Sequence, residues 1–236
     1  MNVLVIAKRE LAAYFLSPIA YVVGAAFLFI TGLFFYFTVA FDYLATLSQV
    51  FTVVAVILLF VAPILTMRLL AEEARSGTLE LLLTAPVRDW EVVMGKFIAA
   101  FLLFVAMLSP TLYYLLVLTF YGAPDLPITF SGYLGLILLG GMLLSLGVLT
   151  SAMTANQIIA AVLGVALALT FWLSGGLGAT LAGPVGSLFT YLAVQNHFAD
   201  FLVGLVTTSN LIYFLSVTAA ALFLATRVLE IRRWRK

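Results

Sequence analysis

The sequence predicts an all-α integral membrane protein with six membrane-spanning helices, and three observations lead to that prediction. Of the 236 residues, 65% are hydrophobic and only 9% are charged, whereas a soluble domain carries about 25% charged residues. Runs of about 20 apolar residues recur along the chain, which is the length that crosses a hydrocarbon core as a helix. With six spans, all 11 Lys and Arg residues fall on one side of the membrane, as the positive-inside rule requires.

The six expected spans contain two helix-distorting prolines. Pro63 lies near the charged end of the second span, and Ser109-Pro110 interrupts the third, so we expect both helices to bend. No Asp, Glu, Lys or Arg lies in the middle of any span, which argues against a proton- or sodium-coupled carrier. We place the spans at residues 19–41, 47–67, 97–121, 130–151, 157–174 and 211–229.

The chain begins with a short charged segment. Charges cluster at Lys8, Arg9 and Glu10, and Pro18 disfavours a helical conformation at the residue before it. We interpret residues 1–18 as an amphipathic elbow helix that lies at the membrane interface, because the segment is too short and too charged to span. A ragged cytosolic start is the alternative.

Residues 174–209 form a second irregular region. Glycine and proline are expected to break any single helix here, and Ser187 and Asn196 are expected to cap two short helices. Neither helix is long enough to span, so we predict a pair of re-entrant or interfacial helices on the outer side before span six. Residues 1–236 then form one transmembrane domain. The breaking residues are Gly175, Gly176, Gly178, Gly183, Pro184 and Gly186.

Basic residues predict the orientation. With six spans, both termini and residues 68–96 share the side that carries every Lys and Arg, whereas the other loops carry Asp42, Asp125 and Asp200. The positive-inside rule places the basic side in the cytoplasm. We therefore expect a multi-pass protein of the cell (inner) membrane with both termini cytoplasmic.

Several kinds of active site are excluded by the sequence. The chain has no Cys and one His, and Trp90 stands where a nucleotide-binding loop ending in Gly95-Lys96 needs its first glycine. Ser174 and His197 share a side, but the serine motif also lacks its first glycine, which argues against an intramembrane protease. We expect no catalytic residue, metal or cofactor on this chain. The net charge of +1 predicts no nucleic-acid partner.

Residues 68–96 concentrate charge between two long apolar runs. Arg68 and Glu72 stand four apart, so the second span is expected to continue as a helix until Gly77 ends it. A new short helix is expected to begin at Thr78, with Glu80 in its first turn, where a carboxylate suits the helix dipole.

The rest of this segment completes a compact protrusion. Leu81, Leu82 and Leu83 give the short helix an apolar face, Pro86 ends it, and Asp89 is expected to cap span three. Apolar side chains beside charged ones on a protruding helix suit a protein partner. A solvated hairpin that merely links spans two and three is the alternative.

Part of this segment resembles a known family. Glu72-Glu73-Ala74-Arg75-Ser76-Gly77-Thr78-Leu79-Glu80, followed by Pro86 and Gly95-Lys96, resembles the cytoplasmic signature of type-2 ABC transporter permeases. Residues 8–18 and 197–204 are similar to the branch that includes gliding-motility-associated permeases. The resemblance covers essentially the whole chain and implies a coupling helix that docks on a separate ATPase. The coupling residues that it implies are Glu72, Glu73, Arg75, Gly77, Thr78 and Glu80.

The resemblance also implies partners. Two ABC ATPase subunits, which bind ATP and Mg themselves, would join two permease subunits as a homodimer or heterodimer. The outer loops are too short to fold as domains, so we name an auxiliary membrane protein with an outer domain as a further candidate partner. We therefore expect the permease subunit of an ATP-driven exporter, itself not an enzyme. One alternative is a non-transporting membrane anchor that uses the ATPase contact to drive another machine. A less favoured one is an ion-coupled secondary transporter.

Overall fold

The structure is a computed structural model that describes residues 2–40, 46–78, 87–121, 124–181 and 183–234. Within these ranges six helices are long and apolar enough to cross a membrane, and no strand occurs. The prediction of an all-α membrane protein with six spans is therefore confirmed. The spans are Pro18–Ala40, Ser48–Ser76, Asp89–Phe120, Leu126–Met153, Gln157–Thr180 and Thr208–Arg232.

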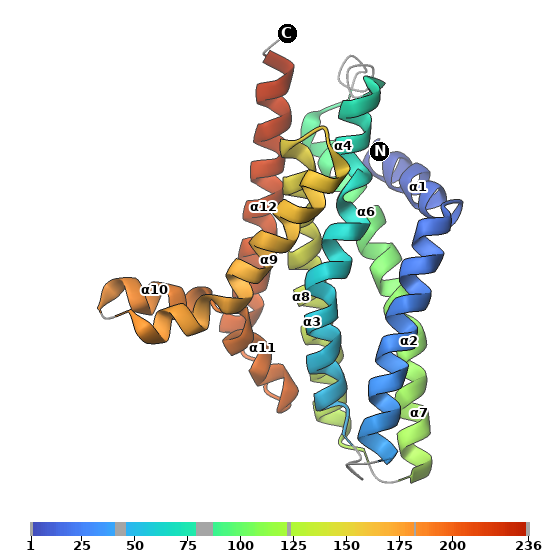
Figure 1. The fold of residues 1–236 in the computed structure, drawn as a ribbon, viewed down its shortest axis with the longest axis vertical. Helices are drawn as coiled ribbons and strands as arrows, with labels where there is room; N and C mark the ends of the chain where they lie inside the picture. Colours follow the sequence, from blue (N-terminus) through green and yellow to red (C-terminus); the bar gives the residue numbers. More distant parts are fainter. Residues whose placement is uncertain (1, 41–45, 79–86, 122–123, 182, 235–236) are drawn as a thin grey trace.

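Most spans correspond to one helix, and two are divided (Figure 1). The second span consists of α3 and α4, and the third consists of α6, a short 3-10 turn and α7. In chain order the elements are α1 (Asn2–Phe15), α2 (Pro18–Ala40), α3 (Ser48–Thr66), α4 (Arg68–Ser76), α6 (Asp89–Leu108), η1 (Ser109–Thr111), α7 (Leu112–Tyr121), α8 (Leu126–Met153), α9 (Gln157–Thr180), α10 (Pro184–Leu192), α11 (Val194–Leu202) and α12 (Thr208–Trp234).

α8 is the central helix of the bundle. In its most apolar stretch 78% of the residues are buried, against 22% for α2 and 28% for α9 and α12. It packs against α3, α6, α9 and α12. The outer helices expose large apolar side chains such as Phe29 and Phe120, as expected of a surface that faces lipid.

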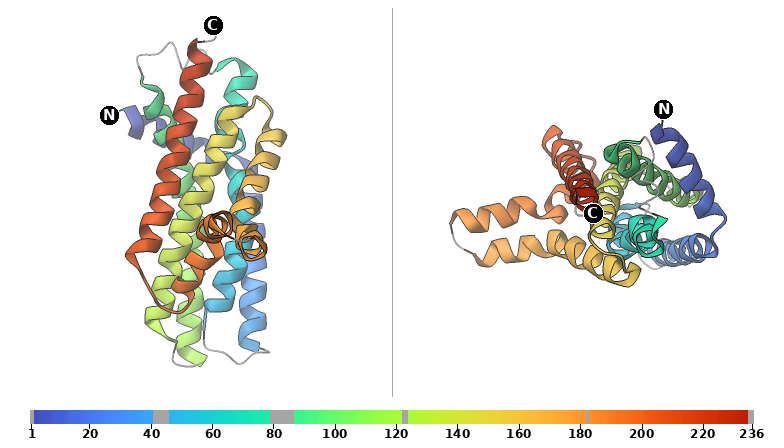
Figure 2. Two further views of the ribbon diagram at one scale, coloured as in Figure 1. Left: turned by 90° about the vertical axis from the view of Figure 1, so that its left-hand side faces the viewer. Right: turned by 90° about the horizontal axis from the view of Figure 1, so that it is seen from above.

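Both chain ends lie toward the same end of the bundle, which we call the basic end (Figures 1 and 2). α4, the start of α6 and the end of α12 lie there, and α1 runs across it. The described Lys and Arg residues belong to α1, α4, α6, its cap Arg88 and the last turns of α12. The opposite end of the bundle holds the end of α2 and the start of α8. The separation of charge predicted from the sequence is therefore present in the fold.

The predicted helix at the start of the chain is confirmed as α1. It ends before Ser17-Pro18, and its buried residues include Ile6, Ala7 and Tyr14. It packs chiefly against α6. α1 is thus an integral part of the packing at the basic end.

Four glycines that were expected to break a helix do not break one. Gly186 lies inside α10. Gly175, Gly176 and Gly178 lie inside α9, which continues well past residue 174, where the fifth span was expected to end. Gly178 lies so close to α10 that a Cβ there would collide with Thr190 Oγ1. In this hairpin glycine allows two helix backbones to approach closely.

The two short helices before span six exist, but they begin earlier than predicted. Gly183, with φ of 78°, is the N-cap of α10, and α11 begins before Asn196, so neither Ser187 nor Asn196 is an N-cap. Pro184 explains the earlier start of α10, because its fixed φ suits the first helical position. The hairpin of α9 and α10 projects from the side of the bundle, and α11 returns to pack on α8 (Figures 1 and 2).

The two proline sites differ in their local effect. Ser109–Thr111 form a 3-10 turn between α6 and α7, which confirms the predicted interruption of span three. Pro63 lies inside α3, and the helix is interrupted one turn later, at Met67. The Met67 N–H still donates to the Pro63 carbonyl at 2.8 Å. The backbone hydrogen bonding of the second span therefore continues from α3 to the junction with α4.

Candidate functional site

α4 extends the second span at the basic end of the bundle (Figure 1). Residues 69–71 are buried, whereas Glu72 and Arg75 are exposed. The helix ends at Gly77, whose φ of 75° is a left-handed conformation that glycine adopts without a Cβ clash. The predicted continuation of the helix and its end at Gly77 are confirmed.

A serine from the central helix holds the junction between α3 and α4. The N–H groups of Leu70 and Ala71 each donate to Ser151 Oγ at 3.1 Å, and the Ser151 hydroxyl donates to the Met67 carbonyl at 3.0 Å. Ser151 is fully buried, so losing these bonds would leave polar groups unpaired. The first turn of α4 is thus tied to α8.

Four charged side chains join α1, α4 and α6, and we call them the ion cluster. The Lys96 ammonium on α6 lies 3.1 Å from Glu10 on α1 and 2.8 Å from Glu73 on α4. Arg9 lies 2.9 Å and 3.3 Å from the same two carboxylates. The Lys96 side chain is 1% exposed and that of Arg9 is 60% exposed. Lys96 is therefore the buried centre of a cluster in which two positive charges balance two negative ones.

Burial and the neighbouring charges have opposite effects on Glu10. Burial alone would raise the pKa of Glu10, but the Lys96 ammonium and the Arg9 guanidinium outweigh it and lower that pKa below 4.5. The hydrogen bond to Glu10 raises the pKa of Arg9. Both side chains are therefore ionised at neutral pH.

The end of α1 is fixed on the junction between α3 and α4. The Tyr14 hydroxyl donates to the Leu65 carbonyl at 2.6 Å, and burial raises the pKa of Tyr14, so it stays a neutral donor. The Arg68 guanidinium lies 4.7 Å from the centre of the Tyr14 ring and donates to Ser17 Oγ at 2.8 Å. A cation over an aromatic face adds to the attraction. The elbow helix and α4 are thus joined at two places.

The predicted coupling residues fall into three groups. Glu72, Arg75 and Thr78 are exposed, with Gly77 at the turn between them. Glu73 instead belongs to the ion cluster, and its Oε2 is buried without a hydrogen-bond partner in the part of the chain that the structure describes. Thr78, where the short amphipathic helix was predicted to begin, is helical, but Glu80 and the rest of that helix lie outside the described residues.

The sequence did not reveal the ion cluster. From the sequence, Lys96 is one basic residue at the edge of span three, and Arg9 and Glu10 are interfacial charges. The bond between Lys96 and Glu10 joins residues 86 positions apart, and a single sequence does not show such a pairing. The sequence offered one indication of such a pairing, namely that residues of opposite charge were expected on the same side of the membrane.

The start of α6 differs from the prediction by one residue. Arg88 is the N-cap, Asp89 is the first helical residue, and the Glu91 carboxylate accepts the Arg88 N–H at 2.9 Å. Two acidic residues in the first turn suit the positive end of the helix dipole. Asp89 therefore favours the start of α6 without capping it.

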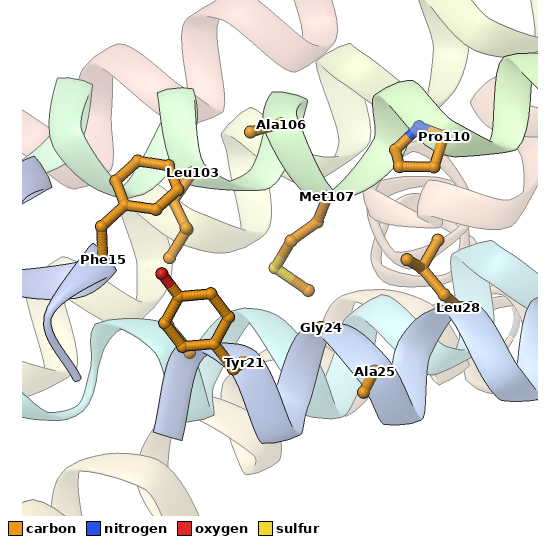
Figure 3. A pocket seen from close by; sticks show the side chains of 10 residues that line it. Phe15, Tyr21, Gly24, Ala25, Leu28, Leu103, Ala106, Met107 and Pro110 are labelled. Atoms are coloured by element: carbon orange, nitrogen blue, oxygen red, sulfur yellow. The ribbon is translucent and has the colours of Figure 1, made fainter. Parts of the chain in front are cut away.

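An apolar cavity lies between α2 and α6 (Figure 3). Its volume is about 320 Å³, and Phe15 at the end of α1 is one of the residues that line it. Gly24, Ala25 and Ala106 line it and leave room because their side chains are small or absent. Its lining suits a hydrocarbon chain better than a charged group, which would lose its hydration there.

Ser174 and His197 have other partners than each other in the described residues. Ser174 Oγ donates to the Phe171 carbonyl of its own helix at 2.9 Å. The ring nitrogens of His197 lie 2.8 Å from Asn210 Oδ1 and 2.9 Å from the Tyr191 carbonyl. The nucleophile–base pair that a serine protease needs is not formed by these contacts.

The structure is that of a polytopic helical membrane protein. It has six candidate spans, a helix packed across one end and a charged helical extension of the second span at the same end. Residues 35–234 match the family described as ABC-2 family transporter protein, and the chain belongs to this family. It is therefore a membrane permease component of an ABC transporter. The matched range begins within α2, so α1 precedes it. A search of curated proteins found no match to the chain.

Proposed function

We propose that this chain is the permease of an ATP-driven exporter and that a separate ATPase subunit drives it through residues 68–96. The two faces of α4 carry this proposal. One face exposes Glu72 and Arg75, and the other is buried and bonded to α1, α6 and α8. A partner that pushes on the exposed face would therefore move several helices together, because close-packed helices transmit displacement.

The family supports the remaining parts of the proposal. Permeases of this family work with ATPase partners and in pairs, so we propose two ATPase subunits, which carry ATP and Mg, and a second permease subunit. The resemblance of residues 8–18 and 197–204 supports the gliding-motility-associated branch. The clustering of Lys and Arg at the basic end supports a cytoplasmic location for that end and for both termini, in the inner membrane.

The contacts of α4 suggest a division of roles among the coupling residues. Glu72, Arg75 and Thr78 are exposed and available to a partner, and we assign Glu80 to the same contact from its place in the motif. Glu73 is bonded within the chain, so its role is to pass movement from α4 to α1 and α6. Gly77 sets the turn between the two parts.

Site-specific photo-crosslinking in cells tests the proposed contact. A photoreactive amino acid at Arg75 or Thr78 should capture a polypeptide that contains a nucleotide-binding loop. The same probe at Leu126, which is 48% exposed at the opposite end of the bundle, is the control and should not capture it. Capture at Leu126 alone, or equal capture at all three sites, would contradict the proposal. ATP-dependent movement of an amphiphilic dye into proteoliposomes then distinguishes an exporter from an anchor that drives another machine.

A further inference from the structure

A chain of hydrogen bonds links α10, α11 and α12 in the half of the molecule further from the termini (Figure 1). Asn210 Nδ2, on α12, donates to Asp200 Oδ2, on α11, at 2.8 Å. Asn210 Oδ1 lies 2.8 Å from Nδ1 of His197, also on α11. Nε2 of His197 lies 2.9 Å from the carbonyl of Tyr191, on α10. Four groups in sequence thus connect the projecting hairpin to the start of span six.

The number of protons shared by these four groups determines whether every hydrogen bond among them can form. The amide nitrogen of Asn210 faces Asp200, so the amide oxygen of Asn210 faces Nδ1 of His197. The other ring nitrogen of His197, Nε2, faces the carbonyl oxygen of Tyr191. An oxygen of either kind accepts, so both ring nitrogens must donate. If the amide were reversed, Asp200 would have to supply a hydrogen instead. In both arrangements the His197–Asp200 couple holds one proton more than a neutral imidazole and a carboxylate do together.

In the described elements that pack on α11, the other titratable side chains are tyrosines, apart from the charged last turns of α12 at the basic end. The His197 ring stacks on Tyr213 with ring centres 3.9 Å apart, and the edge of Tyr191 lies against it at 5.4 Å. α11 also packs on α3, α8 and α9. The sequences of α3 and α9 contain no titratable side chain, and α8 contains Tyr133, whose hydroxyl is 3.1 Å from Thr111 Oγ1. No lysine or arginine occurs in α10 or α11.

We infer that the His197–Asp200 couple is a proton-binding site and that the bound proton stabilises the contact of α10 and α11 with the start of α12. When the couple holds the proton, every bond from Asp200 to the Tyr191 carbonyl can form. When the proton leaves, one ring nitrogen has a lone pair directed at an oxygen, and that bond is lost. A second proton on Asp200 does not break the chain, because a carboxylic acid still accepts through its carbonyl oxygen. We therefore expect the contact of α10 and α11 with α12 to be stable at low pH and to open more often as the pH rises.

Spin-label distance measurements on the full-length protein in nanodiscs test this inference. The chain has no Cys, so cysteines at Leu188 on α10 and Ile212 on α12 are the only labelled sites. These side chains are 56% and 59% exposed, so the labels should not disturb the packing. We expect one narrow distance at pH 6 and about a tenfold larger open population at pH 9, as follows from losing one charge-assisted hydrogen bond.

Asp200→Asn is the decisive variant, because it keeps the shape of the side chain. An amide at this position can donate to Asn210, which then donates to a neutral His197, so every bond forms without the extra proton. We expect this variant to stay closed at both pH values. Opening of Asp200→Asn at pH 9 to the wild-type extent, or identical wild-type distances at both pH values, would overturn the inference.

A second measurement does not depend on labels. The chain has one His, so a sample labelled with ¹⁵N-histidine contains a single imidazole, whose nitrogen shifts report its protonation. At pH 6 we expect the wild type to hold the extra proton either on the ring, with hydrogen on both nitrogens, or on Asp200, as reported by the ¹³C shift of its labelled carboxyl group. In Asp200→Asn we expect a neutral ring at the same pH. A neutral ring beside an ionised Asp200 carboxylate in the wild type at pH 6 would refute the assignment.

Discussion

Replacing Lys96 by methionine tests whether the ion cluster holds the elbow helix to the bundle. Methionine keeps much of the side-chain volume but removes the ammonium that lies 3.1 Å from Glu10 and 2.8 Å from Glu73. Two mostly buried carboxylates would then face one another beside the exposed Arg9, the other basic residue that contacts them in the part of the chain that the structure describes. Breaking a buried ion pair costs about 3–5 kcal/mol. We expect a decrease of that size in the free energy of unfolding, measured by denaturant titration of the purified protein in micelles.

Two further variants separate the charge from its surroundings. Arg9→Gln removes a charge that is 60% exposed, so we expect a loss of at most about 1 kcal/mol. Combining Lys96→Met with Glu10→Gln and Glu73→Gln should recover most of the lost stability, since buried ion networks can often be replaced by neutral groups without loss. A Lys96→Met protein as stable as the wild type, or an equal loss in Arg9→Gln, would refute this account of the cluster.

Two other predictions concern the same end of the bundle. Ser151→Ala should lower the free energy of unfolding by about 1–3 kcal/mol, because two N–H groups and a carbonyl lose their partner. Ser109→Ala is the control. The Ser109 hydroxyl donates to the Ala106 carbonyl one turn earlier, so its loss should change the free energy of unfolding by at most about 0.5 kcal/mol. The pKa of Glu10 is lowered on folding from its usual 4.5, so its contribution to stability is present above pH 4.5 and is lost as the pH falls through its folded-state pKa. Unfolding measured between pH 6 and pH 3 should therefore show a smaller acid destabilisation in Glu10→Gln than in the wild type, and an identical pH dependence would count against the pairing of Glu10.

The fold class was predictable because a bilayer limits what a chain can do. A spanning helix must be about 20 residues long and nearly free of charge, so the length and polarity of each run predicted all six spans. The prolines at positions 18 and 110 also acted as expected, because a missing N–H and a fixed φ have local consequences that the sequence shows directly.

The glycines after residue 174 show where local reasoning failed. A glycine has two uses, as a helix breaker and as a point where two backbones approach, and the sequence around it does not distinguish them. Gly183 precedes α10 as its N-cap and lies outside the helix, whereas Gly178 lies inside α9 and packs on α10. Which use applies depends on the neighbouring helix, and that is a property of the assembled hairpin.

The candidate site was predictable in outline but not in its internal bonds. The end of α4 at Gly77 followed from a glycine placed after a charged helix, a purely local signal. The burial of Lys96 between α1 and α4 depends on how three separate helices meet. Sequence distance hides such contacts, so Glu73 was grouped with the exposed residues beside it.

The central claim is that the exposed face of α4 receives the ATPase. The most direct test is the affinity of the purified permease for its ATPase subunit when Glu72 and Arg75 are both replaced by alanine. Lys8→Ala, which removes another exposed charge at the same end of the bundle, is the matched control. We predict that the double variant unfolds like the wild type but binds the ATPase at least about tenfold more weakly, a change of about 1.4 kcal/mol, and that Lys8→Ala binds normally. Wild-type binding by the double variant would contradict the claim.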